Sequence, residues 1–335
     1  MAEATRDGQR VAENTRDGQR VAEITRDGQR VAEAARDGQR VAENTRDGQR
    51  VAETARDGQP VAEITRDRWR VAEMTCGRCR VVEIKTPGEI DAIGAAGQVV
   101  ARILAAAKAI AAPGTRLAEL DEAARGVLAD AGAFSPFLGY QPRSAPVPYP
   151  AAICVSVNDA AQHGIPGRHK LRDGDLVSVD AGAVMDGWTA DAAFSFTVGP
   201  PRPADARLIS VTADALRAGI AAAVPGARTG DISAAIGAVG RAAGYGICPH
   251  FGGHGVGRAM HEDPHIPNEG TAGRGHPIRP GLVIAIEPWF MAGGRDGCRI
   301  DKDGWTVRSA DGSRAAHIEH TVAVTADGPR ILTAP

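Results

Sequence analysis

The stretch His250–Pro264, HFGGHGVGRAMHEDP, decides how the whole chain is interpreted. It places His254 and His261 seven residues apart, with glycines at 252, 253 and 255 around the first of them. Because glycine has no Cβ, such a segment lets the backbone pass close to a bulky neighbour. His254 in this tight segment suits a metal ligand or a catalytic base. For the stretch taken alone, a loop with two solvated histidines is the alternative.

Four acidic residues accompany these histidines at strand-linked positions. Apolar runs predict strands ending on Asp180 and Glu287, and an alternating run at 187–198 and a run at 316–324 predict strands carrying Asp191 and Glu319. Unpaired carboxylates in buried strands are costly. Four carboxylates and one imidazole suit a pair of Mn, Fe, Co or Zn ions, which would activate a bridging water and polarise a carbonyl. Any one of these acids alone would equally be a surface charge.

The elements around these acids recur in two similar sets. Helices are predicted at 87–112 and 116–131, and again at 203–224 and 230–244, with strands after each pair. Thr86, Pro87 and Glu89 predict a capped start of the first helix. Thr115 and Asp231 are the predicted caps of later helices. Further strands are predicted at 152–157 and 305–307. The pattern predicts an α+β fold whose two halves face each other across a shared site.

From residue 81 onward the chain resembles methionine aminopeptidases of type I, in the pita-bread metallopeptidase superfamily. The matching segments are SVNDAAQHGIPG, DAGAVMDGWTADAAFSF, GGHGVGRAMHEDP, IAIEPWF and IEHTVAV, in this order along the entire domain. The resemblance implies a pita-bread fold, with two pseudo-symmetric helix-helix-strand halves and an antiparallel sheet around a dimetal site. It also implies removal of the initiator methionine from nascent chains, by a metal-bridging hydroxide that attacks the first peptide bond.

Position by position, the resemblance assigns roles in this site. The ions would be two divalent metals (Co, Mn, Fe, Zn or Ni), held by Asp180, Asp191, His254, Glu287 and Glu319. Asp191 and Glu319 would reach both ions, and Glu287 would also carry a proton. His261 would bind the scissile carbonyl, and His163 would contact the leaving side of the peptide.

The resemblance also implies an apolar, sulfur-tolerant pocket for the methionine side chain. Its residues would be Phe137, Tyr140, Tyr149, Cys154, Met260 and Trp305. The segment at 141–148 is longer than the usual spacing between Tyr140 and Tyr149, so the placement of Tyr149 depends on how this segment folds. Core packing is the alternative role of these aromatic residues.

Residues 1–80 are eight units of ten, with the consensus VAExTRDGQR. The regular apolar residues of each unit are Val and Ala, which bury too little surface to offset the ordering entropy. We therefore expect 1–80 to be a disordered extension and 81–335 to be the catalytic domain. Asp-Gly also allows weak hairpins, and solenoid rungs or a binding tether are further alternatives. Because Val81 reads like a natural domain start, we hypothesise that the cellular protein begins there. Cys76 and Cys79 lack the second pair of a zinc ribbon.

Composition excludes several other functions. The net charge of −2 among 335 residues gives no basic surplus for nucleic acid. The N-terminus lacks the apolar region of a secretory signal, and no stretch suits a membrane span. The five cysteines, an odd number, suggest no disulfide framework, so we expect a cytoplasmic protein. The resemblance implies a monomer. Its partners would be the N-terminal methionine of nascent polypeptides and, through the extension, the ribosome.

Two other functions stay open. One is an Xaa-Pro aminopeptidase or prolidase, which would carry a folded N-terminal domain that a repeat tract does not supply. The other is a catalytically inactive pita-bread binding module, although all five ligand positions are intact.

Overall fold

The computed structural model describes residues 82–334 in full and, before them, the backbone of five strands between 3 and 43. The chain divides into two compact units, 1–60 and 61–335. Residues 44–81, which include the Cys76–Cys79 motif, lie outside the described part. The predicted domain boundary at 80/81 falls there and stays a prediction.

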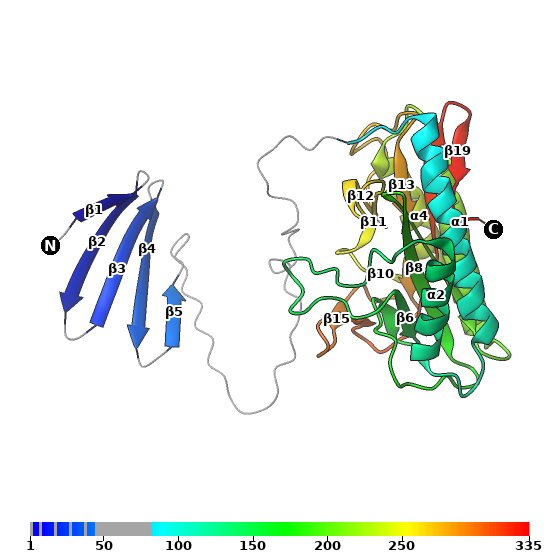
Figure 1. Cartoon of the computed structure of the whole chain (residues 1–335), viewed down its shortest axis with the longest axis horizontal. Helices are drawn as coiled ribbons and strands as arrows, with labels where there is room; N and C mark the ends of the chain where they lie inside the picture. The colour runs from blue at the N-terminus through cyan, green and yellow to red at the C-terminus, as the bar shows by residue number, and fades with distance from the viewer. Residues whose placement is uncertain are drawn as a thin grey trace. The chain divides into compact units, whose positions relative to one another are not determined.

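The described part of the repeat forms an antiparallel sheet in sequence order (Figure 1). Its strands are β1 Glu3–Arg6, β2 Gln9–Arg16, β3 Gln19–Arg26, β4 Gln29–Arg36 and β5 Gln39–Glu43. Arg6 pairs with Gln9 and Arg16 with Gln19, so two residues, Asp-Gly in sequence, separate consecutive strands. Over 3–43 this differs from the disorder that we favoured. The physical reason lies in the period, because ten residues supply an eight-residue strand and a two-residue connection that suits a hairpin.

The second unit contains two helix pairs: α1 Pro87–Ile110, α2 Leu117–Ala131, α3 Pro203–Ala222 and α4 Thr229–Ala243. Its main sheet has the order β12-β11-β13-β18-β9-β8-β6, with β19 on β18. All of these pairs are antiparallel. These strands are β6 Ile153–Val157, β8 Leu176–Met185, β9 Trp188–Thr197, β11 Gly252–Gly255, β12 Glu262–Pro267, β13 Val283–Ile286, β18 Glu319–Thr325 and β19 Gly328–Ile331.

Two small sheets complete this unit, with the orders β10-β14-β17 and β15-β16-β7. Their strands are β7 Ala160–Gln162, β10 Gly246–Ile247, β14 Trp289–Met291, β15 Cys298–Ile300, β16 Val307–Ser309 and β17 Ala315–His317. Each of them is two or three residues long, too short for a periodicity argument. The strands predicted at 305–307 and 316–324 overlap β16 and β17, and the sequence did not reveal the other four.

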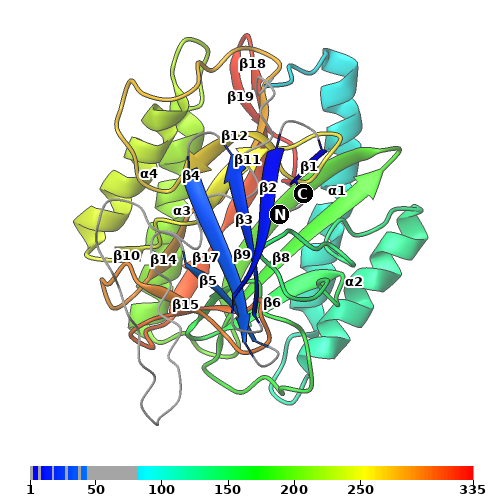
Figure 2. The same ribbon diagram turned by 90° about the vertical axis from the view of Figure 1, so that its left-hand side faces the viewer.

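The predicted α+β arrangement of two similar halves is confirmed. Helices α1 and α2 pack with β6, β8 and β9 around one apolar core, whereas α3 and α4 enclose a second core with β13 and β18. The pairing of β9 with β18 joins the halves in one sheet. In Figure 2 the two helix pairs lie on opposite sides of the view, with this sheet between them. Helix α1 is long and apolar enough to span a membrane by composition, but its apolar side is buried against β8 and β9.

The helix starts show which local signals hold, and α2 and α4, the second helices of the two halves, begin in the same way. The Thr86–Glu89 capping box of α1 is confirmed. The predicted caps Thr115 and Asp231 are wrong, because α2 and α4 begin after Arg116 and Arg228. Each arginine pairs in extended form with a distant segment, at Lys170 or Pro277, so this tertiary contact fixes where the helix begins. The main-chain N–H of each arginine then donates to an acid three residues later, Glu119 or Asp231, at 2.8 and 2.7 Å.

Candidate metal centre and active site

Strand alternation brings the acidic residues to one face of the main sheet. On β8, Val177, Val179 and Ala181 face the helices, so Asp180 faces the other way. On β9, Ala190 and Ala192 face the helices, and Asp191 between them shares the face of Asp180. Glu287 follows β13 directly, and Glu319 begins β18. The sheet therefore delivers carboxylates from four strands to one place.

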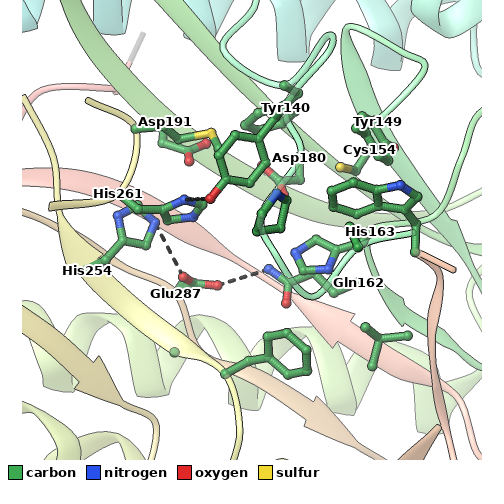
Figure 3. Close-up of a pocket in the computed structure, with 18 of the residues that line it drawn as sticks. Tyr140, Tyr149, Cys154, Gln162, His163, Asp180, Asp191, His254, His261 and Glu287 are labelled. Carbon is green, nitrogen blue, oxygen red and sulfur yellow. Dashed lines mark hydrogen bonds and ion pairs between the residues drawn. The ribbon is translucent and has the colours of Figure 1, made fainter. Parts of the chain in front are cut away.

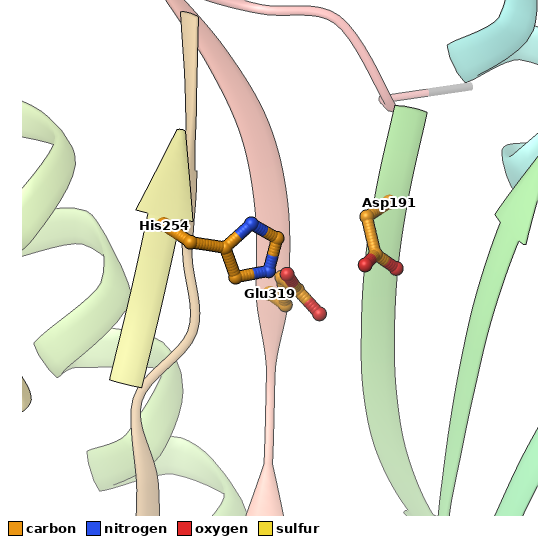
Figure 4. A group of neighbouring side chains, drawn as sticks. All are labelled: Asp191, His254 and Glu319. Atoms are coloured by element: carbon orange, nitrogen blue, oxygen red, sulfur yellow. The ribbon is translucent and has the colours of Figure 1, made fainter. Parts of the chain in front are cut away.

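His254 projects from β11 toward the same place (Figure 4). One ligand atom each of Asp191, His254 and Glu319 lies within 4.8 Å of the others. The Nε2 of His254 is 3.7 Å from Oε1 of Glu287, and Asp180 lies close enough to Asp191 that, after burial, the charge of Asp191 raises the pKa of Asp180. All five predicted ligands are buried and line one pocket. The structure thus brings the predicted ligand set together.

The first part of the histidine stretch is a buried strand, β11, which carries His254, whereas His261 lies in the exposed loop that follows. His254 is 7 % exposed. The predicted close approach at its glycines occurs, and the neighbours are adjacent strands: a Cβ on Gly253 would collide with the carbonyl oxygen of Ala285 on β13, and one on Gly255 with that of Asp263 on β12. The glycines therefore place His254 by letting three strands pack closely.

Burial and mutual repulsion dominate the electrostatics of this cluster. Desolvation, followed by the charge of Asp191, raises the pKa of Glu287 and of Glu319. The same two causes raise the pKa of Asp180. Burial lowers the pKa of His254 to about 4, so this imidazole is neutral at pH 7 and its contact with Glu287 is not an ion pair. Without a cation, the acids share protons instead of carrying four charges.

The residues present fit divalent cations. Oδ1 of Asp180 and Oδ1 of Asp191 are buried without a hydrogen-bond partner. Few buried polar atoms in native proteins lack such a partner. Two or more cations would neutralise the carboxylates and use these oxygens and the neutral imidazole as ligands. The donor set is four oxygen groups and one nitrogen, which suits Mn, Fe, Co or Zn.

Two further histidines stand beside the cluster (Figure 3). The ring of His261 is 4.3 Å from that of His254 between centroids, and its Nδ1 is 3.0 Å from the hydroxyl oxygen of Tyr140. Loss of water around its ring in the pocket, followed by the charge of neighbouring His254, holds the pKa of His261 well below its usual value, although the residue keeps an exposed surface. Burial lowers the pKa of His163 to about 4. Both rings are therefore neutral. His163 also has a left-handed backbone with φ of 55°, a conformation that non-glycine residues adopt rarely and mostly at functional positions.

An apolar pocket of about 380 Å³ opens beside these groups. All six predicted side-chain pocket residues line it: Phe137, Tyr140, Tyr149, Cys154, Met260 and Trp305. The long segment at 141–148 adds Pro142, Ser144 and Ala145 to its wall. Tyr149 stays in place despite this segment, because its hydroxyl donates to the carbonyl oxygen of Gly164 at 2.9 Å and its ring packs edge-on against Trp305. These side chains therefore both pack in a small apolar core and line the pocket.

Sequence reasoning missed two residues behind Glu287. The side-chain amide of Gln162 donates to Oε2 of Glu287 at 3.0 Å, and Nε2 of His317 lies 3.7 Å from carboxylate oxygens of Glu287 and Glu319. Both residues are buried. The only sequence signals were their positions, beside His163 and two residues before Glu319. Residues in such positions do not bind a metal themselves but orient the side chains that do.

The profile of metallopeptidase family M24 matches residues 91–326. A methionine aminopeptidase 1 of Mycobacterium tuberculosis is 52 % identical over 256 residues, covering 74 % of this chain and 94 % of that protein. The crystal structure of a methionine aminopeptidase from Thermotoga maritima matches 76 % of this chain and 100 % of its own, with a TM-score of 0.72 and 38 % identity.

A prolidase from Pyrococcus furiosus is less similar, with 25 % identity, a TM-score of 0.58 and 65 % of its own chain covered. The prolidase covers 75 % of this chain, much as the methionine aminopeptidases do, but a third of the prolidase has no counterpart here. The methionine aminopeptidases, in contrast, are matched over nearly their whole length. With this coverage and identity, the chain belongs to metallopeptidase family M24 and, within it, to the methionine aminopeptidases.

Proposed function

We propose that this pocket removes the N-terminal methionine of nascent proteins and peptides with the help of two divalent ions. The observation that carries the proposal is the convergence of four buried carboxylates and a neutral imidazole on the wall of a sulfur-tolerant pocket. Asp180, Asp191, His254, Glu287 and Glu319 would hold the ions. When bound, the ions supply the acidity that yields a nucleophile from water at neutral pH.

The chain's own residues do the rest of the work. His261, neutral at pH 7, donates an N–H to the carbonyl oxygen on which negative charge develops. Tyr140 contacts its Nδ1, and a hydroxyl that donates there leaves Nε2 protonated for this task. Glu287, whose pKa is raised by burial, accepts and returns a proton near neutral pH, and Gln162 holds one of its oxygens. His163 lies on the leaving side of the peptide.

The pocket explains a preference for methionine. Cys154, Met260 and Trp305 offer polarisable, apolar surface to a thioether side chain, with Tyr149 packed edge-on against the indole. The proposed ligands line the same pocket, so a bound side chain would place the first peptide bond near them.

The test is release of methionine from Met-Ala-Ser by the full chain with added Mn(II) or Co(II). We expect turnover that a chelator abolishes and that metal restores. Hydrolysis of an Xaa-Pro dipeptide but not of Met-Ala-Ser would identify a prolidase. Inactivity with every metal, together with retained peptide binding, would identify a binding module. Metal analysis of protein purified without added ions would identify the resident ions and their number.

A further inference from the structure

The loop between β11 and β12 holds His261 over the pocket, and its conformation is fixed by contacts from outside the loop. The main-chain N–H of Thr189 donates to the carbonyl oxygen of Gly257 at 2.7 Å. The guanidinium of Arg258 stacks on the ring of Trp188, 3.6 Å from its centroid. These contacts come from the first two residues of β9, Trp188 and Thr189. They hold the first half of the loop, before His261.

The second half of the loop is held by Lys85, which precedes α1. Its side chain is 1 % exposed, and its Nζ lies 2.5 Å from Oε2 of Glu262, the residue after His261. The other oxygen of Glu262 accepts the main-chain N–H of Ala259 at 3.1 Å. One carboxylate therefore joins Lys85 to both sides of the catalytic imidazole. A buried ammonium needs such a partner, so the pair is constrained.

The route of Lys85 to this loop is fixed as well. Its main-chain N–H donates to the carbonyl oxygen of Gly281 at 2.7 Å. Its side chain then crosses Gly257 so closely that a Cβ there would lie 2.5 Å from Cε of Lys85. A second acid, Glu83, lies 3.6 Å from Nζ but is half exposed. The ammonium is thus directed to Glu262 by packing as well as by charge.

We propose that Lys85 is a positioning residue for His261, and this inference rests on the proposed function. The ion pair with Glu262 fixes the backbone at 259–262, which sets the direction in which the imidazole donates. A misplacement of about 1 Å at a catalytic group can cost on the order of 100-fold in rate. The segment immediately before α1, at the junction with the repeat, is therefore part of the active centre.

A double-mutant cycle on the full chain tests this coupling. Turnover of Met-Ala-Ser is measured for K85M, H261A and the double variant, in saturating Mn(II). If Lys85 acts through His261, K85M lowers kcat by at least about tenfold with little change in KM. In the H261A background the same change lowers kcat by less than about twofold, because the effects of coupled residues do not add. K85R, which keeps the ion pair, retains nearly full activity.

Arg330→Met is the matched control, since it removes an exposed ion pair with Asp91 on α1 and is expected to leave kcat unchanged. Imidazole NMR signals of His261, assigned with H261A, should shift in K85M and not in R330M. If K85M does not fold, E262Q replaces it in the same cycle.

Equal effects of K85M in both backgrounds, or no effect at all, would overturn the inference, as would unshifted His261 signals. A wild-type chain that fails to release methionine would instead refute the proposed function, and the NMR comparison would still decide the placement of His261.

Discussion

Four carboxylates buried together make the metal-free protein sensitive to pH. Burial and Asp191 raise the pKa of Glu287 to about 8, and the pKa of Glu319 is raised for the same reasons. The folded protein thus keeps protons that the unfolded chain releases near pH 4 to 5, so this stability is lost as pH rises through 8. The lowered pKa of His254 opposes this only below about pH 6.5, where the unfolded imidazole is protonated.

We therefore expect the Tm of the chelator-treated protein to fall between pH 6.5 and 8.5. Mn(II) should remove the fall, because a bound cation replaces the protons. Thermal unfolding followed by circular dichroism across this range measures both curves. A metal-free Tm that stays level or rises with pH would contradict the assignment of shared protons to this cluster.

The proton-carrying role of Glu287 gives a second prediction at this scale. Glu287→Gln keeps the size of the side chain and removes its basicity, so kcat should fall by about 100-fold or more while the fold is unchanged. Methionine release and the far-ultraviolet circular dichroism spectrum are the measurements. Glu122→Gln, on the exposed side of α2, is the control and should have full activity. Near-normal turnover of E287Q would show that Glu287 does not carry the proton.

Single residues were predictable where a local motif carries them. The five proposed ligands lie in the segments that carry the resemblance, and the six pocket residues were assigned by their positions in it; the structure places all of them around one pocket. Lys85 and Glu262 were not found, because 177 residues separate them and neither sequence context points to the other. The roles of Gln162 and His317 were not predicted for the same reason, because they depend on contacts with Glu287 and Glu319 that only the fold creates.

At the scale of elements, α1 shows how a small residue determines packing. Gly97 faces the C-terminal segment, and a Cβ there would collide with the main-chain oxygen of Leu332. A Cβ added to Gly126 on α2 would instead have no neighbour within 4 Å. Gly97→Ala should destabilise the protein by about 1–3 kcal/mol through overpacking. Gly126→Ala should stabilise it by roughly 0.5–1 kcal/mol, because alanine is the better helix former. Urea unfolding of both variants measures the difference, and equal effects would contradict this packing.

Helix starts illustrate the limit of local signals. The start of α1 was predicted correctly, because Thr86 and Glu89 satisfy each other's backbone groups within one turn. The predicted caps of α2 and α4 were misplaced by one and three residues, since Arg116 and Arg228 pair with segments far along the chain. Short strands such as β14 and β15 carry no period, so the same limit applies to them.

At the scale of the whole molecule, the catalytic unit is expected to function without the repeat. The described contacts of this unit begin at Val82, which packs against the second apolar core. A chain that starts at Val81 should therefore keep its Tm and turn over Met-Ala-Ser within about twofold of the full chain. A chain that starts at Pro87 lacks Lys85 and should lose at least about tenfold in kcat. Equal activity of the two truncated chains would contradict a catalytic unit that includes Lys85.

N-terminal sequencing of the native protein tests whether the cellular chain begins near Val81, and peptides from 1–70 would refute that hypothesis.

The C-terminal segment of the catalytic unit is fastened to the helix with which the unit begins. The side-chain amide of Gln98 donates to the carbonyl oxygen of Ala334 at 2.9 Å, and Arg330 pairs with Asp91. At a rise of about 1.5 Å per residue, Gln98 lies about 16 Å along the axis from the first residue of α1. A flexible bridge of six to eight residues, on the order of 15 Å in mean reach, would span this gap. The two termini of the catalytic unit could therefore be joined by such a bridge, and new termini could be made at an exposed turn. The product would be a circularly permuted enzyme of unchanged architecture.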